Sequence, residues 1–233
     1  TPAVIAIVRF LQERGLRPAV LTRGYARAGT RQGVIDAADP EVWGDEPVLM
    51  KLNTNVDVIV GSNRYENAIK YLDYNDCDLF ILDDGFQHLQ LHRDLDVVID
   101  VPSAAFHREG RSALRDASIV IPRRLKTIVP PEASGRPLFA FSGLADNQQF
   151  FDALRNLGLT LAGTRSFPDH HRYTADDLAA IAEAARAAGA EALLTTEKDA
   201  VKTRSWSERP LVARAEFEID GEILERIASL VTR

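Results

Sequence analysis

The chain has 233 residues, of which 45% are hydrophobic and 27% charged, and these proportions exclude a disordered or fibrous protein. Lysine and arginine total 28 against 34 acidic residues, so the net charge of −6 provides no overall attraction to nucleic acid or to anionic lipid. The single cysteine, Cys77, excludes an intrachain disulfide and a cysteine-based metal cluster, and suits a reducing compartment.

The first half of the chain alternates helical patterns with short apolar segments. We expect a helix over residues 2–14 that ends at Gly15, followed by a strand over residues 18–22. Further strands are predicted at residues 56–60, 79–82, 96–101 and 118–121, with a helix at residues 64–73. Continuous apolar strands separated by helices are typical of a parallel sheet covered on both faces, which is the α/β class. Ligands of such sheets bind beyond the carboxyl ends of the strands.

The second half of the chain predicts a smaller α/β unit. Proline and glycine residues predict a linker at residues 130–137, between a first lobe at 1–129 and a second at 138–233. The expected order in the second lobe is a strand at 138–141, a helix at 148–157, a loop at 166–173, a helix at 175–188, and strands at 192–195 and 211–215. No apolar run reaches the roughly 18 residues that a membrane-spanning helix needs.

Two acids follow the strand predicted at residues 79–82. Asp83 and Asp84 end this apolar segment, and Gln87 and His88 come just after them. Because Mg²⁺ prefers hard oxygen ligands beside phosphates, this arrangement predicts a magnesium site in a nucleotide-binding fold. Gln87 and His88 would lie where a phosphate or an attacking group sits. The alternative is that the acids only cap a turn.

The chain begins with Thr1, directly before an apolar helical pattern. In a phosphate-binding loop, glycines and a lysine precede a serine or threonine that opens a helix, and its hydroxyl binds Mg²⁺. Thr1 fits the last position of such a loop. We therefore expect the lysine and glycines to lie upstream of these residues, and the 233 residues alone to bind ATP poorly. A helix that merely starts with threonine is the alternative.

Two further segments carry charges where a ligand could bind. Asp45 and Glu46 lie in what we expect to be a tight loop, and paired carboxylates suit a metal or a general base, although acid-rich turns are common. Arg23 follows the strand at residues 18–22 and could reach an anion.

The second lobe contributes a pair of histidines and a lysine. His170 and His171 have no cysteine or third histidine nearby, so a zinc site is disfavoured. A histidine oriented by a carboxylate as a general base is the better functional interpretation. Only one of two adjacent histidines can face a cleft, and we favour His171. Lys198 follows the strand at residues 192–195 and could contact a phosphate or pair with Glu197.

Taken together, these motifs resemble the tetraacyldisaccharide 4'-kinases, the lipid A 4'-kinases of Gram-negative envelope synthesis. Six segments carry the resemblance, in family order along nearly the whole chain: Thr22-Arg23-Gly24-Tyr25, Gly44-Asp45-Glu46-Pro47, Asp83-Asp84-Gly85-Phe86-Gln87-His88 with Arg93-Asp94, Phe141-Ser142-Gly143, Phe167-Pro168-Asp169-His170-His171, and Thr196-Glu197-Lys198-Asp199.

The resemblance implies a phosphate-binding-loop kinase with a RecA-like amino-terminal lobe, a smaller carboxyl-terminal α/β lobe and an active site in the cleft between them. The implied reaction is transfer of the γ-phosphate of ATP, with Mg²⁺, to the 4'-hydroxyl of a tetraacylated disaccharide 1-phosphate in lipid A biosynthesis. The lipid substrate implies peripheral contact with the inner membrane at its cytoplasmic face, and the resemblance places the family's membrane-associating helix upstream of Thr1. Nucleic acid is not an expected partner, and the oligomeric state is left open.

The resemblance also implies roles for single residues. The expected Mg²⁺ ligands are Thr1, Asp83, Asp84 and Glu46. The expected nucleotide contacts are Thr1, Arg23, Gln87, His88 and Lys198. The expected base is Asp45 together with His171 or His170.

One segment departs from the family pattern. Residues 106–116 are short and contain His107-Arg108-Glu109-Gly110-Arg111, so acceptor contacts made there by the family are not carried over. Two other functions are weighed against the lipid kinase: a phosphate-binding-loop kinase or NTPase with a soluble substrate, and a binding module without turnover.

Overall fold

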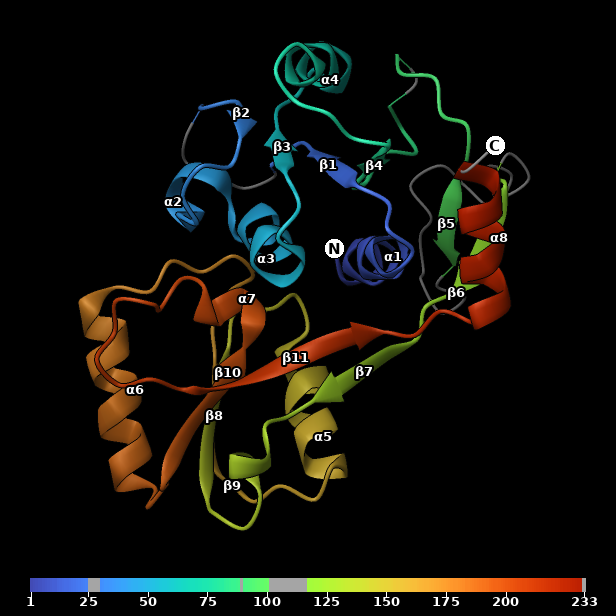
Figure 1. Cartoon of the computed structure of the whole chain (residues 1–233). Coiled ribbons are helices and arrows are strands. Elements are labelled where there is room, and N and C mark those ends of the chain that lie inside the picture. Colours follow the sequence, from blue (N-terminus) through green and yellow to red (C-terminus); the bar gives the residue numbers. More distant parts are fainter. Residues whose placement is uncertain (25–29, 89, 101–116, 232–233) are drawn as a thin grey trace.

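The computed structural model of the chain describes all residues except 25–29, 89, 101–116 and 232–233 (Figure 1). The described residues fold into two α/β units, one built mainly on the first half of the chain and one on the second half (Figure 1). This architecture confirms the α/β class predicted from the alternation of apolar strands and helices.

The first unit is a four-stranded sheet in the order β2-β3-β1-β4. Its strands are β1 (Pro18–Thr22), β2 (Gly33–Val34), β3 (Val58–Val60) and β4 (Leu79–Leu82). β1 pairs in parallel with β3 and β4, whereas β2 runs antiparallel to β3. Because β1 lies between two strands and is buried along its whole length, its apolar sequence continues without alternation.

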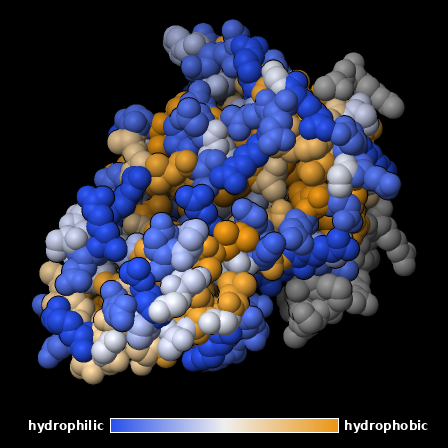
Figure 2. Space-filling view, turned by 60° about the horizontal axis from the view of Figure 1, so that its bottom comes forward, coloured by the Kyte–Doolittle hydropathy of each residue, from blue (hydrophilic) through white to orange (hydrophobic). Residues whose placement is uncertain are grey.

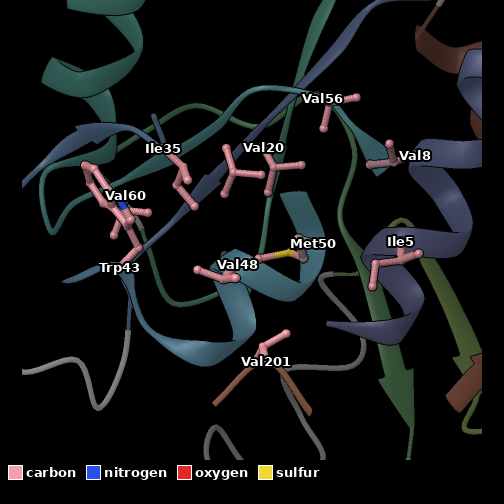
Figure 3. Close-up of a cluster of buried hydrophobic side chains, with 11 residues drawn as sticks. Ile5, Val8, Val20, Ile35, Trp43, Val48, Met50, Val56, Val60 and Val201 are labelled. Carbon is pink, nitrogen blue, oxygen red and sulfur yellow. The ribbon is translucent and has the colours of Figure 1, made fainter. Parts of the chain in front are cut away.

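Helices cover both faces of this sheet. On one face, Val20 of β1 packs against Ile5 of α1 (Pro2–Glu13) and Val48 of α3 (Asp45–Thr54) (Figure 3). On the other face, Leu21 of β1 packs in a cluster with side chains of α4 (Arg64–Leu72). Successive residues of β1 thus point to opposite layers, as the pleat of a strand requires.

The expectation of a tight loop at Gly44–Pro47 is wrong. Gly44, with a φ of 90°, separates two helices, α2 (Pro40–Trp43) and α3. Pro47 is the third residue of α3, and a proline is tolerated in the first turn because its missing N–H would have no partner within the helix. Asp45 and Glu46 open the helix, where the helix dipole favours negative charge.

Two short parallel strands, β5 (Val97–Asp100) and β6 (Ile119–Pro122), form a separate sheet beside the first unit. Ile119 and Ile121 of β6 pack with side chains of α1 and of the last helix, α8 (Gly221–Val231). The carboxyl-terminal helix therefore packs on the first unit (Figure 1).

The second unit is a five-stranded sheet in the order β7-β11-β10-β8-β9, in which only β7 is antiparallel to its neighbour. Its strands are β7 (Leu125–Ile128), β8 (Leu138–Ser142), β9 (Leu161–Ser166), β10 (Ala192–Thr196) and β11 (Leu211–Phe217). Helix α5 (Asn147–Asn156) covers one face and α6 (Ala175–Ala187) the other, while a 3₁₀ turn (Pro131–Ala133) and α7 (Glu197–Ala200) lie in connections.

Two elements cross the predicted division at residues 130–137. β7 precedes it but pairs with β11 in the second sheet, and α8 follows it but packs on α1. The domain boundaries stay a prediction, and the described sheets do not follow them. The two units also share core packing, because Val201 of the second lies in the cluster that contains Val48 and Met50 of α3 (Figure 3).

The surface mixes hydrophilic and hydrophobic groups. Figure 2 shows hydrophilic side chains over much of one face, with hydrophobic ones reaching the surface in separate patches. Scattered apolar groups of this kind are normal and mark no site by themselves. Within the described residues, no helix has the length and apolar character needed to cross a membrane.

Candidate functional site

Asp83 lies at the carboxyl edge of the first sheet. β1 and β4 are parallel neighbours with Leu21 opposite Leu82, so the residues that follow, Thr22 and Asp83, are side by side. Asp83 is only 9% exposed, yet its contacts are long: Thr22 Oγ1 lies 3.4 Å from Oδ2 and the backbone nitrogen of Thr1 lies 3.4 Å from Oδ1. A buried carboxylate whose contacts are this long is a candidate ligand for a cation.

Thr1 connects this edge to α3. Its backbone nitrogen faces Asp83, as described, and its hydroxyl donates a hydrogen bond of 2.6 Å to Glu46 Oε2. Asp84 differs from Asp83, because its side chain is exposed and its φ of 50° lies in the left-handed region. The structure thus brings Thr1, Asp83 and Glu46 together, whereas Asp84 lies in the turn beyond them.

Arg64 holds the turn after β4, and the sequence analysis did not identify it as a candidate site residue. It is 2% exposed, and its Nη2 donates to the backbone carbonyls of Asp83 at 3.4 Å and Asp84 at 3.2 Å. Burial and the neighbouring Arg23 lower the pKa of Arg64. Its position in the sequence could have marked it as unusual, because Arg64 is the first residue of α4, where the helix dipole disfavours a cation. A cation there indicates a specific partner.

His88 and Gln87 follow the same turn. Gln87 and Arg23 are exposed, whereas His88 is partly buried and its Nε2 has no hydrogen-bond partner within the described part of the chain. Burial, and then the charges of Arg64, Arg23 and Arg93, lower the pKa of His88. A histidine with a lowered pKa and three arginines close enough to act on its charge offers hydrogen-bond donors to an anionic group such as a phosphate.

The second part of the site joins the two units. Asp45, at the start of α3, is 5% exposed, and the Nδ1 atom of His170 lies 3.2 Å from its Oδ1 and 3.1 Å from its Oδ2. The two residues are 125 positions apart in the sequence. His170 has a φ of 57°, in the left-handed region that residues other than glycine rarely adopt, and this backbone directs its ring toward α3.

The preference for His171 as the histidine that faces Asp45 is wrong. His171 Nε2 lies 3.0 Å from Asp177 Oδ2, and its ring stacks on Phe167 with centroids 4.6 Å apart. Asp177 also closes the capping box of α6 with Thr174. The two adjacent side chains point apart, as expected. His170 points to Asp45 in the first unit, whereas His171 points to Asp177 in the second unit.

Lys198 lies beside the Asp45–His170 pair. Its Nζ atom donates to Asp169 Oδ1 at 2.9 Å and lies 3.2 Å from His170 Nε2, 3.7 Å from Glu46 Oε1 and 3.9 Å from Asp45 Oδ2. The expected contact of Lys198 with a phosphate stays a prediction. In the structure its neighbours are Asp45 and His170 of the predicted base, together with Asp169 and Glu46.

The sequence indicated no role for Lys202, nor for Asp199, which appeared there only as the last residue of the Thr196-Glu197-Lys198-Asp199 motif. Lys202 Nζ lies 2.9 Å from Asp199 Oδ1 and 3.9 Å from Asp45 Oδ2, and 9% of its side chain is exposed. Asp199 is fully buried, and its Oδ2 accepts from the Gly143 backbone N–H at 3.0 Å and the Thr196 hydroxyl at 2.7 Å. In the sequence this pair has the spacing of an ordinary surface ion pair, so its burial could not be read there.

Gly143 fixes the histidine loop to β8. A Cβ atom at this position would lie 3.0 Å from the carbonyl oxygen of Pro168 and 3.1 Å from Asp199 Oδ1. Only a glycine lets the loop and the buried carboxylate approach the backbone so closely. The motifs around Gly143, His170 and Asp199 therefore form one packed structure.

A pocket opens beside the pair. Its lining includes Glu41, Asp45, His170, Arg172, Tyr173 and Lys202. Both units contribute to this lining, so the pocket lies where they meet. A substrate hydroxyl placed there would have the Asp45–His170 pair as a proton acceptor.

Two predictions lie outside the described residues: those for Tyr25 and for the segment 106–116 with His107 and Arg108.

Comparisons with known proteins all point to one family. The sequence matches the model of a protein family described as Tetraacyldisaccharide-1-P 4'-kinase (LpxK) over residues 1–109 and 110–232. The tetraacyldisaccharide 4'-kinase of Syntrophobacter fumaroxidans (strain DSM 10017 / MPOB) is 34% identical over an alignment that covers 100% of this chain and 75% of the relative. That of Anaeromyxobacter sp. (strain K) is 36% identical, with 97% of this chain and 76% of the relative covered.

A solved structure is similar as well. The crystal structure of an "apo" form of LpxK from Aquifex aeolicus, in complex with ATP, matches this fold with a TM-score of 0.78 and 27% sequence identity. The match covers 100% of this chain and 82% of that chain.

Proposed function

The chain belongs to the tetraacyldisaccharide-1-P 4'-kinase family, and we propose on this premise that it transfers the γ-phosphate of ATP to the 4'-hydroxyl of a tetraacylated disaccharide 1-phosphate in lipid A biosynthesis. The observation that supports this most directly is the position of Thr1. It contacts Asp83, at the edge suited to Mg²⁺ and phosphates, and Glu46, next to the predicted base Asp45. Thr1 thus links the Asp83 edge to the first turn of α3, which also carries Asp45.

Mg²⁺ fits the Asp83 edge. Within the described residues no group of three or more histidine, cysteine or acidic side chains forms a metal cage. Mg²⁺ in kinases is usually held by one or two protein oxygens together with phosphate oxygens and water. Asp83, buried with only long contacts, and the Thr1 hydroxyl would supply such ligands, with Glu46 and Asp84 as further candidates. Bound there, the ion would neutralise charge on the phosphates.

The triphosphate itself fits the cationic side of the same edge. Arg23, Arg64 and Arg93 surround His88, whose buried Nε2 is available for a hydrogen bond. The similar LpxK of Aquifex aeolicus was solved in complex with ATP. We propose that Arg23, Gln87 and His88 contact the nucleotide phosphates, while Arg64 holds the turn that presents Asp83.

The proposed base is the Asp45–His170 pair. In phosphoryl transfer the acceptor hydroxyl loses its proton, and positioning with electrostatic stabilisation supplies most of the rate. Asp45 and His170 lie at hydrogen-bond distance from each other and both line the pocket between the units. Such a pair can orient the hydroxyl and take its proton. The two units must therefore be in contact for the base to exist.

Transfer assays test the proposal. The protein is incubated with ATP labelled at the γ-phosphate, Mg²⁺ and the tetraacyldisaccharide 1-phosphate in detergent micelles, and the lipid product is analysed by mass spectrometry. We expect one added phosphate, and none when the acceptor lacks its 4'-hydroxyl. Equal transfer to soluble glucosamine would favour the soluble-substrate kinase, and binding of ATP without any transfer would favour the binding module.

We further propose that the protein acts at the cytoplasmic face of the inner membrane, in peripheral contact with it. The acyl chains of the proposed acceptor remain in a bilayer, while ATP is available in the cytoplasm. Sedimentation with lipid vesicles checks this proposal. Binding should increase when the vesicles contain the acceptor lipid, and equal recovery in the supernatant with and without vesicles would contradict it.

A further inference from the structure

Two opposite charges lie at the mouth of the pocket between the units. Glu41 comes from the first unit and Arg172 from the second, and both side chains line the pocket and are exposed. In the part of the chain that the structure describes, neither side chain has a hydrogen-bond or ion-pair partner, and the two do not pair with each other. Asp45, deeper in the same pocket, lies 3.1 Å from His170. The pocket therefore has a paired interior and an unpaired mouth.

The backbone that carries each of these side chains is held in place. Asp39 caps α2, and its Oδ1 accepts a hydrogen bond from the backbone N–H of Glu41 at 2.9 Å. The residue after Arg172 is Tyr173, which also lines the pocket and packs its ring edge-on against Phe141 with centroids 5.7 Å apart. Both charges thus extend from a fixed backbone, as a binding residue requires.

The hydrogen-bonding capacities of the two groups are opposite. A carboxylate only accepts hydrogen bonds, and a guanidinium only donates them. A ligand that satisfies both must therefore offer a donor to Glu41 and an acceptor to Arg172. An acylated sugar phosphate has both kinds of group, because its free hydroxyls donate, whereas its acyl carbonyl and ionised phosphate oxygens accept.

The charges that line the pocket disfavour a polyphosphate there. Two carboxylates, those of Glu41 and Asp45, oppose two cations, those of Arg172 and Lys202, so the lining has no excess of positive charge. The arginines that suit a triphosphate lie instead at the Asp83 edge. A sugar with hydroxyl and carbonyl groups fits this balance better than the phosphates of a nucleotide.

We propose that Glu41 and Arg172 determine the acceptor specificity of the transfer. Glu41 accepts a hydrogen bond from the 6'-hydroxyl of the sugar that is phosphorylated, which branches from the ring carbon next to C4'. Arg172 donates to an acceptor oxygen of the same lipid, either the carbonyl of an O-linked acyl group or the 1-phosphate. This inference rests on the proposed function, since it names groups of the proposed acceptor. Because the two residues come from different units, the sugar is oriented only where the units meet.

Matched acceptors test the Glu41 contact. Glu41→Met removes the hydrogen-bond acceptor and should lower kcat/KM for the full acceptor by about tenfold or more, the size of a hydrogen bond to a charged group. On an acceptor that lacks the 6'-hydroxyl, wild type and Glu41→Met should be equal, because the partner is already absent. Glu41→Gln, whose amide oxygen still accepts, should recover part of the loss.

The Arg172 contact is tested in the same way. Arg172→Met should raise KM for the lipid by about tenfold or more, while KM for ATP stays that of wild type, since ATP is proposed to bind at the Asp83 edge. Two analogues identify the partner: one lacks the 1-phosphate, and the other has an ether in place of the O-acyl ester. The loss should disappear on the analogue that lacks the oxygen to which Arg172 donates.

Two further variants are matched controls. Glu222 is an exposed acid in the first turn of α8, as Glu41 is in α2, and Arg204 is an exposed arginine of the second unit. Both lie outside the lining of the pocket. Glu222→Met and Arg204→Met should leave KM for both substrates unchanged, so a loss confined to the Glu41 and Arg172 variants is due to the pocket.

The outcomes separate the two proposals. If wild type phosphorylates the lipid but each variant loses the same factor on the full acceptor and on every analogue, the inference is wrong. If wild type phosphorylates no acceptor, the proposed function is wrong, and the contacts are tested by binding alone. Calorimetric titration with the lipid in detergent micelles should then show weaker binding for Glu41→Met and Arg172→Met than for the two controls. Equal binding by all four variants would overturn the inference as well.

Discussion

The Asp83 edge and the Asp45–His170 junction are linked through Thr1 and Glu46 but are built differently. The edge belongs to the first unit alone, and its buried carboxylate has two contacts of 3.4 Å. The junction joins both units, and Asp45 has ionic contacts of 3.1–3.9 Å with His170, Lys198 and Lys202. The edge thus offers a carboxylate with two long contacts beside a group of arginines, whereas Asp45 in the junction already lies close to His170, Lys198 and Lys202.

This difference makes separable predictions. Substitutions at the edge should impair catalysis without destabilising the fold. The Asp83 carboxylate makes only long contacts, so its removal should cost little free energy of folding. Substitutions in the ion network of the junction should affect stability and activity together, because each removed partner leaves a buried charge behind.

The largest effect is expected for Asp83→Ala. We predict a loss of about 10³-fold in kcat, since a charge-stabilising group at the phosphates is removed. Stability should be unchanged or slightly higher, because a buried and weakly paired carboxylate is costly. Steady-state kinetics and thermal unfolding of the same protein check both parts, with Asp83→Asn as the variant that keeps the shape. Near-normal turnover of either variant at ordinary Mg²⁺ would refute the assignment.

Asp199→Ala should cause the largest loss of stability. Its carboxylate is fully buried and holds Gly143, Thr196 and Lys202 together. Its removal leaves two donors unpaired and leaves the buried Lys202 ammonium with only the 3.9 Å contact to Asp45 Oδ2. Breaking a buried pair on one side costs about 3–5 kcal/mol. Urea unfolding measures this free energy. If the double variant Asp199→Ala, Lys202→Met were no more stable than Asp199→Ala, the unpaired lysine could not be the cause.

Asp45→Ala and His170→Ala should each reduce kcat by about 10²-fold, the range of general acid–base catalysis. Since the two side chains act as one proton acceptor, the double variant should be scarcely slower than the worse single variant. Kinetics at saturating ATP measure the three losses. Fully multiplicative losses would show that the residues act independently, and the pair could then no longer be called one base.

The sequence predicted the first part of the site better than the second. β1 and β4 have the predicted bounds, and the acids after β4 lie at the sheet edge because a strand and its following turn are local features. The choice between His170 and His171 failed because it depends on the left-handed backbone at His170, which nothing in the adjacent residues requires. Arg64 and Lys202 were missed, and Asp199 was quoted in a motif without a role, because their burial is created by segments distant in the sequence.

The region around α3 shows the same contrast between what local sequence predicts and what it does not. The first turn of α3 was expected to be a loop, because Gly44 and Pro47 are turn residues out of context. In the structure each is at a helix terminus, where its conformation is favourable. Local propensity thus marked Gly44 and Pro47 as boundary residues, but it did not predict α2 and α3 on either side, nor β7, β9 and α8 elsewhere in the chain.

The smallest expected effect concerns the neighbouring pair, His171 and Asp177, the local counterpart of His170 and Asp45. Backbone and side-chain hydrogen bonds from Thr174, with a further one from His171, lower the pKa of Asp177 from its ordinary 3.8 to about 2. A carboxyl whose pKa is lowered in the folded protein stabilises the fold above the unfolded pKa, and this contribution is lost as the pH falls from about 4 to about 2. Asp177→Asn should therefore lower the free energy of unfolding by about 1 kcal/mol at neutral pH, the contribution of a helix cap, and by progressively less in acid.

The kcat of Asp177→Asn should equal that of wild type, because this pair lies on the helix-capping side of the loop. Unfolding measured from pH 7 to pH 2, beside kinetics at pH 7, tests both statements, and a large loss of kcat in a stable Asp177→Asn protein would mean that the two histidine pairs are not separate devices.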